Sequence, residues 1–183
     1  MTQLFLLARD GVLSVDRDGF VKHPGELQLI EGAARAVARL NEANVRVAVC
    51  TNQPVVGRGI IGRDQLDRIH LALRDLLAGQ GARLDLLVDC TDAPHGHSTR
   101  RKPEPAMLLE VIRHFGAHPA ATPMVGTEVA DLQAAQRAGC SRVLVRTGKG
   151  RDTQGGGLPE EVLPVSVHDD LAAAVDAYLE GSR

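Results

Sequence analysis

The stretch LFLLARDGV at residues 4–12 decides the fold, because four apolar residues lead directly into a charged turn that contains glycine. An apolar run this short, without helical spacing, is typical of a strand buried on both faces. Further strand-sized apolar runs lie at 45–49, 84–88, 124–125 and 142–145, and a weaker one lies at 165–167. The chain is therefore predicted to form a sheet of short, buried strands.

Longer stretches with the apolar spacing of helices lie between these runs, at 33–43, 65–77, 107–115, 132–138 and 171–179. This alternation predicts βαβ crossovers, which place parallel strands in one sheet and helices on both of its faces. We therefore predict an α/β, three-layer, Rossmann-like fold with a mainly parallel sheet. In such folds ligands bind beyond the carboxyl ends of the strands, so the informative residues should follow the strands.

Local signals place several element ends. Asp64 is predicted to cap the helix that begins near Gln65, while Gly116 and Gly139 follow apolar helical runs and are predicted to end them. The glycine-rich segment 148–157 is predicted to be a surface loop before the last strand.

Two further features have ordinary structural interpretations. Asp16-Arg17-Asp18-Gly19 follows no buried strand and is predicted to be a turn. His70, His114 and His118 lie in or near helical stretches and are predicted to be surface residues.

The composition of the 183 residues is that of an ordinary globular protein, with 44% hydrophobic and 24% charged residues. The formal net charge is -2, so the chain as a whole does not attract nucleic acid or an anionic membrane. Only 2% of the residues are aromatic, which leaves few side chains to stack on bases. We therefore expect no nucleic-acid partner and no membrane partner, and any anion site must be local.

The cysteines indicate a reducing compartment. Cys50, Cys90 and Cys140 are an odd number at wide spacing, which is a poor disulfide framework, and Cys50 and Cys140 are predicted to lie in the core. No apolar run approaches the roughly 20 residues that span a bilayer, and the first residues enter a strand rather than a signal peptide. A cytoplasmic location is the expectation.

Polar side chains follow four of the predicted strands. The motifs, in chain order, are Ala8-Arg9-Asp10-Gly11, Thr51-Asn52-Gln53, Arg101-Lys102-Pro103, and Gly126-Thr127 with Asp131 close behind. Because parallel strands end at one edge of their sheet, we expect these side chains to meet in one pocket.

This arrangement resembles the haloacid-dehalogenase (HAD) superfamily of phosphatases, which carry Asp-x-Asp after the first strand, Ser or Thr after the second, a Lys before a later helix and acidic residues after the fourth. Within it, Thr51-Asn52-Gln53, Arg58-Gly59 and Arg101-Lys102-Pro103 resemble the heptose-bisphosphate and histidinol-phosphate phosphatase branch. The resemblance covers nearly the whole chain. It implies a HAD-like fold, with residues 1–183 as a single domain and a minimal cap domain or none.

The resemblance also implies roles for individual residues. In the family a carboxylate attacks phosphorus, a second aspartate handles protons, and magnesium neutralises the phosphoryl oxygens. Asp10 stands at the acid/base position, while Thr51 and Lys102 would contact the phosphoryl oxygens, and Asn52 and Arg101 would face the substrate. The phosphate- and substrate-binding candidates are Thr51, Asn52, Gln53, Arg58, Arg101 and Lys102.

The match breaks at the two positions that matter most for the reaction. Ala8 stands at the nucleophile position, and a methyl group can neither attack phosphorus nor bind magnesium. Thr127 stands where the family has its main metal-binding carboxylate, which leaves Asp131 as a thin site for a hard cation. We therefore predict that no cofactor is bound, although the family uses magnesium.

A third difference lies in the loop before Arg101, where this branch often carries a structural zinc site of four Cys and His ligands. The aligned residues here are Cys90, Asp92, Ser98 and Arg100. Cys90 is a remnant of that zinc loop, so zinc is not expected. The alternative is an improvised site made by Cys90 with His95 and His97.

Three functions follow from these observations. The leading hypothesis is a pseudophosphatase that is inactive or severely impaired, retains a pocket for a phosphorylated sugar or other small anion, and has a possible regulatory protein partner. The second is an active D,D-heptose 1,7-bisphosphate 7-phosphatase, or a related phosphomonoesterase, that uses a displaced carboxylate such as Asp10 or Glu128. The third is a structural or interaction protein.

Overall fold

The computed structural model of the chain describes residues 2–181. Its strands form one six-stranded parallel sheet in the order β3-β2-β1-β4-β5-β6. The strands are β1 (Leu4–Leu7), β2 (Arg46–Asn52), β3 (Leu86–Cys90), β4 (Pro123–Gly126), β5 (Ser141–Val145) and β6 (Ser166–His168). The strand order reverses between β1 and β4, and in a sheet of this kind that point opens a crevice at the strand ends.

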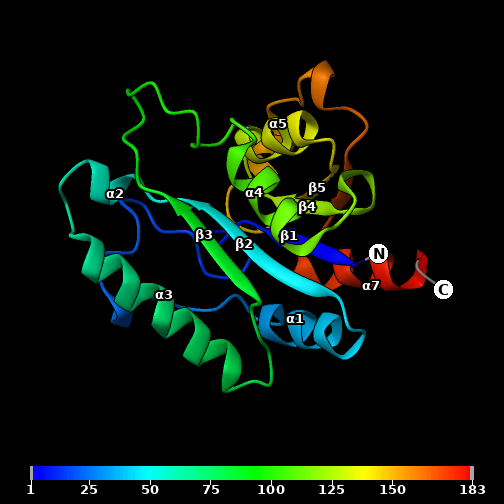
Figure 1. Cartoon of the computed structure of the whole chain (residues 1–183), viewed down its shortest axis with the longest axis horizontal. Coiled ribbons are helices and arrows are strands. Elements are labelled where there is room, and N and C mark those ends of the chain that lie inside the picture. The colour runs from blue at the N-terminus through cyan, green and yellow to red at the C-terminus, as the bar shows by residue number, and fades with distance from the viewer. Residues whose placement is uncertain (1, 182–183) are drawn as a thin grey trace.

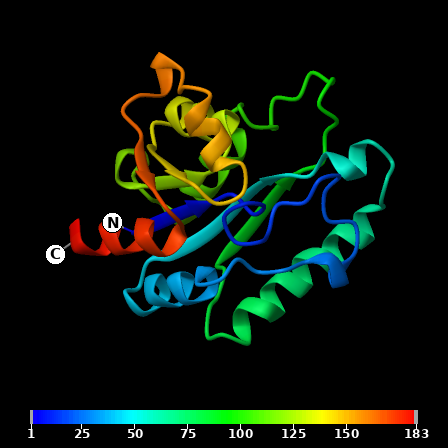
Figure 2. The same ribbon diagram turned by 180° about the vertical axis from the view of Figure 1, so that it is seen from behind.

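The helices follow the predicted alternation. They are α1 (Ala33–Glu42), α2 (Pro54–Gly57), α3 (Arg63–Ala78), α4 (Ala106–Phe115), α5 (Val129–Ala138), α6 (Gly150–Gly155) and α7 (Leu171–Gly181), with short 3-10 turns at Pro24–Glu26, Pro119–Ala121 and Glu160–Val162. Helices α1, α3 and α7 lie on one side of the sheet, and α4 and α5 lie on the other (Figures 1 and 2). The predicted three-layer α/β fold is confirmed.

The central strand shows why the apolar runs are unbroken. All four residues of β1 are at most 1% exposed, because helices cover both faces of a parallel sheet. Phe5 packs edge-on against Tyr178 of α7 with ring centroids 5.0 Å apart, which fixes the last helix on the sheet. Cys50 and Cys140 are buried in the core, as predicted.

Three long segments follow β1, β2 and β3, and two of them contain only short helices. They are residues 8–32, with the 3-10 turn Pro24–Glu26, and residues 53–62, with the four-residue α2. The third segment, residues 91–105, contains neither a helix nor a strand. Within the described part of the chain, no separate cap domain stands over the crevice.

The helix ends correct one prediction and confirm two. Helix α3 begins at Arg63 with Gly62 at its N-cap position, so Asp64 lies in the first turn and does not cap the helix. A carboxylate there still interacts favourably with the helix dipole. Gly116 and Gly139 end α4 and α5 in the left-handed conformation, as predicted.

The segment 148–157 is not a loop, because α6 occupies residues Gly150–Gly155. A side chain on Gly150 would place its Cβ 1.7 Å from the carbonyl oxygen of Val145, so this glycine serves close packing rather than flexibility. Thr153 donates its hydroxyl to the carbonyl of Thr127 at 2.7 Å and ties α6 to the end of β4. Glycine content alone was therefore a misleading signal.

The prediction for His70 was wrong, because this side chain is buried on α3 and its Nδ1 lies 3.6 Å from Asp89. Burial, reinforced by the nearby Arg9 guanidinium, lowers the pKa of His70 to about 4. His70 is therefore neutral at physiological pH. Within residues 2–181, no helix combines the length and apolar character needed to cross a lipid bilayer.

Candidate functional site

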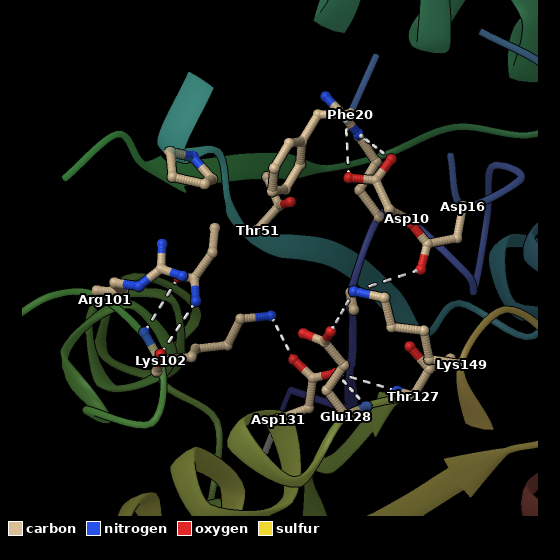
Figure 3. Close-up of a pocket in the computed structure, with 14 residues that line it drawn as sticks. Asp10, Asp16, Phe20, Thr51, Arg101, Lys102, Thr127, Glu128, Asp131 and Lys149 are labelled. Carbon is tan, nitrogen blue, oxygen red and sulfur yellow. Dashed lines mark hydrogen bonds and ion pairs between the residues drawn. The ribbon is translucent and has the colours of Figure 1, made fainter. Parts of the chain in front are cut away.

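The motifs that follow the strands meet in one polar cavity of about 180 Å³ at the carboxyl ends of β1, β2 and β4 (Figure 3). Thus the predicted gathering of these motifs is confirmed for most of the candidate residues. The residues that line the cavity are Ala8, Arg9, Asp10, Asp16, Phe20, Thr51, Asn52, Pro54, Arg101, Lys102, Thr127, Glu128, Asp131 and Lys149.

Ala8 and Thr127 bring neutral side chains to the cavity from the adjacent strand ends of β1 and β4. The amide of Ala8 donates to the carbonyl of Val125 at 2.9 Å, which continues the pairing of β1 with β4. Gly11 has a φ of 81°, and a Cβ there would lie 3.0 Å from the Thr127 hydroxyl. The turn after β1 therefore depends on glycine to pass close to Thr127.

Asp10 is held by four hydrogen bonds. Arg9 donates to both carboxylate oxygens from Nε and Nη2, each at 3.0 Å, in the bidentate geometry that suits a guanidinium. Ser14 donates its hydroxyl to one oxygen at 3.1 Å, and Gln53 donates its amide nitrogen to the other at 2.8 Å. These contacts fix the orientation of the Asp10 carboxylate, and the Arg9 guanidinium balances its negative charge.

Arg9 is a cavity residue that was not predicted from the sequence. Its side chain is 0% exposed, and its Nη1 has no hydrogen-bond partner among residues 2–181. Arg9 and Asp10 are chain neighbours in the segment after β1, and a guanidinium beside a carboxylate in a motif that follows a buried strand was the available signal.

Thr51 and Gln53 continue this network at the end of β2. The side-chain amide of Gln53 donates to the Thr51 hydroxyl at 2.9 Å as well as to Asp10. Gln53 is 0% exposed and stands behind the cavity wall. Gln53 therefore orients Asp10 and Thr51, whereas the resemblance had placed it among the phosphate- and substrate-binding candidates.

Lys102 is buried and fixed on the other side of the cavity. Its ammonium donates to Asp131 at 2.6 Å and to the carbonyl of Cys50 at 2.8 Å. Asn52 exchanges two hydrogen bonds with the backbone of Lys102, at 3.0 and 3.1 Å, so Asn52 positions this lysine in addition to lining the cavity. The second oxygen of Asp131 accepts the amides of Thr127 and Glu128 at 3.0 and 3.1 Å.

A second lysine, Lys149, reaches the cavity from the segment after β5. Its Nζ lies 2.7 Å from Glu128 and 3.9 Å from Asp16. The hydrogen bond to Glu128 raises the pKa of Lys149. Burial raises the pKa of Asp16, and the carboxylates of Asp10 and Glu128 add to this effect while Lys149 opposes it. Sequence reasoning missed both Lys149 and Asp16 because neither follows a strand directly.

Arg101 and Arg58 differ in their relation to the cavity. Arg101 lines it and donates to the carbonyl of Asp92 at 3.4 Å. Arg58 ends the short helix α2, and its guanidinium carbon lies 5.7 Å from the ring centre of Phe20, which itself lines the cavity. The structure therefore places Arg58 behind an aromatic wall and not in contact with the cavity.

The loop before Arg101 is organised by the Ser98 hydroxyl. The hydroxyl donates to Asp92 at 2.5 Å and accepts the amides of Arg100 and Arg101 at 3.1 and 2.8 Å. The buried thiol of Cys90 lies 3.7 Å from the same oxygen. Among residues 2–181, no group of three or more His, Cys, Asp or Glu side chains is placed to hold a metal ion. A serine thus holds together the loop that resembles a zinc loop.

The residues at the strand ends do not fit a magnesium ion. Magnesium requires oxygen ligands, usually with one or two carboxylates among them. Ala8 offers no oxygen in its side chain, and Thr127 offers only a neutral hydroxyl. Asp131 is engaged by Lys102 and by two backbone amides, so using it as a ligand would break a buried ion pair.

The comparison with family patterns gives the class of protein. The HAD-hydrolase-like family matches residues 99–174. This span contains Lys102, Thr127 and Asp131, and together with the sheet order and the cavity it defines a HAD-type hydrolase fold.

Comparison with characterised proteins narrows the class. The D-glycero-beta-D-manno-heptose-1,7-bisphosphate 7-phosphatase of Pseudomonas aeruginosa is 40% identical over 97% of this chain and 98% of its own length. The protein of the same name from Bordetella bronchiseptica is 39% identical, also over 97% and 98%. A crystal structure of D,D-heptose 1,7-bisphosphate phosphatase from B. bronchiseptica, complexed with magnesium and phosphate, has a TM-score of 0.93 at 38% identity, covering 98% of this chain and 99% of that one.

The chain therefore belongs to the HAD superfamily and, within it, to the D,D-heptose 1,7-bisphosphate phosphatase family.

Proposed function

We propose that this chain is a pseudophosphatase that binds a phosphorylated sugar and catalyses little or no magnesium-dependent hydrolysis. Ala8 supports the proposal most directly, because its methyl group lines the cavity and the family resemblance assigns residue 8 to the nucleophile position. A methyl group has no lone pair with which to attack phosphorus, so the covalent route has no starting atom there.

The other carboxylates of the cavity do not replace the missing one easily. Asp10 would have to break its bidentate contact with Arg9 in order to attack, and that would leave a buried guanidinium without a partner. Asp131 is engaged on both oxygens. Asp10 and Asp131 therefore serve to hold neighbouring side chains and backbone amides in place.

The phosphate-binding side of the cavity supports retained binding. Thr51, Lys102 and Arg101 face it, and Asn52 fixes the backbone of Lys102. Charged donors of this kind form strong hydrogen bonds with phosphoryl oxygens. Because the relatives act on a heptose bisphosphate by name, a phosphorylated heptose is the ligand class that we propose.

The test combines turnover and binding on the same preparation. Phosphate release from heptose 1,7-bisphosphate should stay at background with magnesium and with EDTA, whereas the ligand should raise the melting temperature equally in both buffers. Binding to the folded state at 100 times the dissociation constant stabilises it by about 2.7 kcal/mol. Sustained turnover that needs magnesium would refute the proposal.

A second candidate function follows from Glu128, which lines the cavity and whose side chain is 47% exposed. This carboxylate is less tightly held than Asp10 and is the better candidate for a displaced nucleophile. The enzyme hypothesis predicts a phosphoryl adduct on Glu128 that mass spectrometry detects after acid quenching. Absence of adduct and of turnover across a phosphate-ester panel would remove its basis.

The third candidate, a purely structural or interaction protein, predicts a different pattern. It predicts no thermal stabilisation with heptose bisphosphate, other sugar phosphates or inorganic phosphate.

A further inference from the structure

The cations that line the cavity differ in how firmly they are held. The side chain of Lys102 is 4% exposed and that of its partner Asp131 is 6% exposed, whereas Lys149 and Glu128 are 55% and 47% exposed. Half-exposed ion pairs contribute roughly 0–1 kcal/mol, because water screens them and competes for both groups. Lys149 can therefore exchange its partner at little cost, while Lys102 cannot.

The charge balance of the cavity favours such an exchange when an anion enters. Its lining contains four cationic side chains, Arg9, Arg101, Lys102 and Lys149, and four carboxylates, Asp10, Asp16, Glu128 and Asp131. A bound phosphate adds negative charge to a set that is already balanced. Since Arg9 and Lys102 are already paired with Asp10 and Asp131, Arg101 and Lys149 are the cations best able to supply further positive charge.

The positions of these two cations are complementary. Arg101 and Lys102 approach from one side of the cavity, and Lys149 extends from the opposite side between Asp16 and Glu128 (Figure 3). An anion beside Thr51 would thus have a cation on each side.

We propose that Lys149 is a phosphate-binding residue that leaves Glu128 when the ligand enters and closes the anion site from the side opposite Lys102. This inference rests on the proposed function, because it concerns the same cavity. It identifies the cation that makes binding independent of a metal ion. Glu128 is half exposed, so water solvates its carboxylate after the exchange.

The first experiment is titration calorimetry of inorganic phosphate in EDTA at fixed ionic strength. Lys149→Gln should weaken binding at least about 10-fold, which corresponds to roughly 1.4 kcal/mol. Lys149→Arg keeps the charge and should stay within about 3-fold of the unchanged chain. Arg151→Gln, the matched control, removes a positive charge two residues away from a side chain that does not line the cavity.

A second variant tests the exchange itself, because a merely structural lysine would not produce the opposite effect. Glu128→Gln frees Lys149 and removes a carboxylate that competes with phosphate, so phosphate should bind more tightly. Glu160→Gln, which neutralises an exposed glutamate elsewhere, is the control. If the unchanged chain binds phosphate and Lys149→Gln binds it equally well, the role of Lys149 is refuted while the proposed function stands. If the unchanged chain binds neither phosphate nor heptose bisphosphate, the proposed function fails and this inference fails with it.

Discussion

The two sides of the cavity differ in how firmly their side chains are held. In one group Thr51, Lys102 and Asp131 are buried, and together with the half-buried Asn52 they form a hydrogen-bonded cradle. In the other group Ala8 and Thr127 are neutral, and the charges are supplied by the half-exposed pair of Lys149 and Glu128. The difference indicates that the side chains of the first group are part of the folding framework, whereas Lys149 and Glu128 can change partners more easily.

The strongest way to break this comparison is to remove Asp131. Asp131→Ala leaves the Lys102 ammonium buried without its counter-ion and frees the amides of Thr127 and Glu128. Breaking a buried pair in this way costs about 3–5 kcal/mol. Urea denaturation should show this loss in the free energy of unfolding.

The matched control is Glu104→Ala, which removes the carboxylate of the exposed pair with Arg137. Its expected cost is less than about 1 kcal/mol. Equal costs for the two variants would mean that the cradle is not part of the folding framework.

The next test rebuilds the altered side. Ala8→Asp combined with Thr127→Asp places two carboxylates at adjacent strand ends and should create magnesium-dependent phosphatase activity. We expect at least about 100-fold over the unchanged chain, because metal and nucleophile together lower the barrier by several kcal/mol. Magnesium should also raise the melting temperature of the double variant, which is a readout independent of turnover.

Each single variant is the control for this pair. Ala8→Asp alone lacks the second carboxylate, and Thr127→Asp alone lacks the nucleophile, so both should stay at background. A soluble double variant with no activity and no response to magnesium would show that the cradle is no longer arranged for phosphate transfer.

The loop organised by Ser98 provides a further test, because it leads into Arg101 and Lys102 of the cradle. Ser98→Ala removes one donor and one acceptor that hold Asp92 and the amides of Arg100 and Arg101. We expect a loss of about 1–2 kcal/mol in unfolding free energy and weaker phosphate binding. Ser166→Ala removes an exposed hydroxyl that bonds to His168 and should change neither quantity appreciably.

Much of the fold could be predicted because the apolar pattern directly reports burial. The run at 4–7 became β1 with the predicted bounds, since a central parallel strand has to be apolar on both faces. The short helix α6 and the buried His70 could not be predicted in this way. A glycine that permits close packing and one that permits flexibility look alike in sequence, and the contact of His70 with Asp89 joins residues far apart in the chain.

The site was predictable to the extent that its residues follow strands. Thr51, Lys102 and Asp131 were found because parallel strands end at one edge of a sheet. Arg9 and Lys149 were missed for different physical reasons. Arg9 is fully buried against its chain neighbour Asp10, and Lys149 comes from a loop whose path depends on tertiary packing.

The smallest expected effect comes from Asp16, which lies beside the half-exposed pair of Lys149 and Glu128. Burial raises the pKa of this carboxyl, so its ionised form is less favourable in the folded state than in the unfolded chain. At neutral pH both states are ionised and the fold carries this penalty, which disappears as the pH falls through the raised pKa toward the ordinary value of about 4.

Asp16→Asn should therefore stabilise the protein at neutral pH by less than about 1 kcal/mol, equivalent to roughly 2–4 °C or less in melting temperature. The gain should shrink steadily as the pH is lowered from 7.5 to 5. Asp18→Asn, an exposed position in the same segment, should show no such pH-dependent gain. If Asp16→Asn instead lowers the melting temperature at pH 7.5, the attraction between Asp16 and Lys149 outweighs the cost of burying Asp16. Lys149 would then be held more firmly than its exposed side chain indicates.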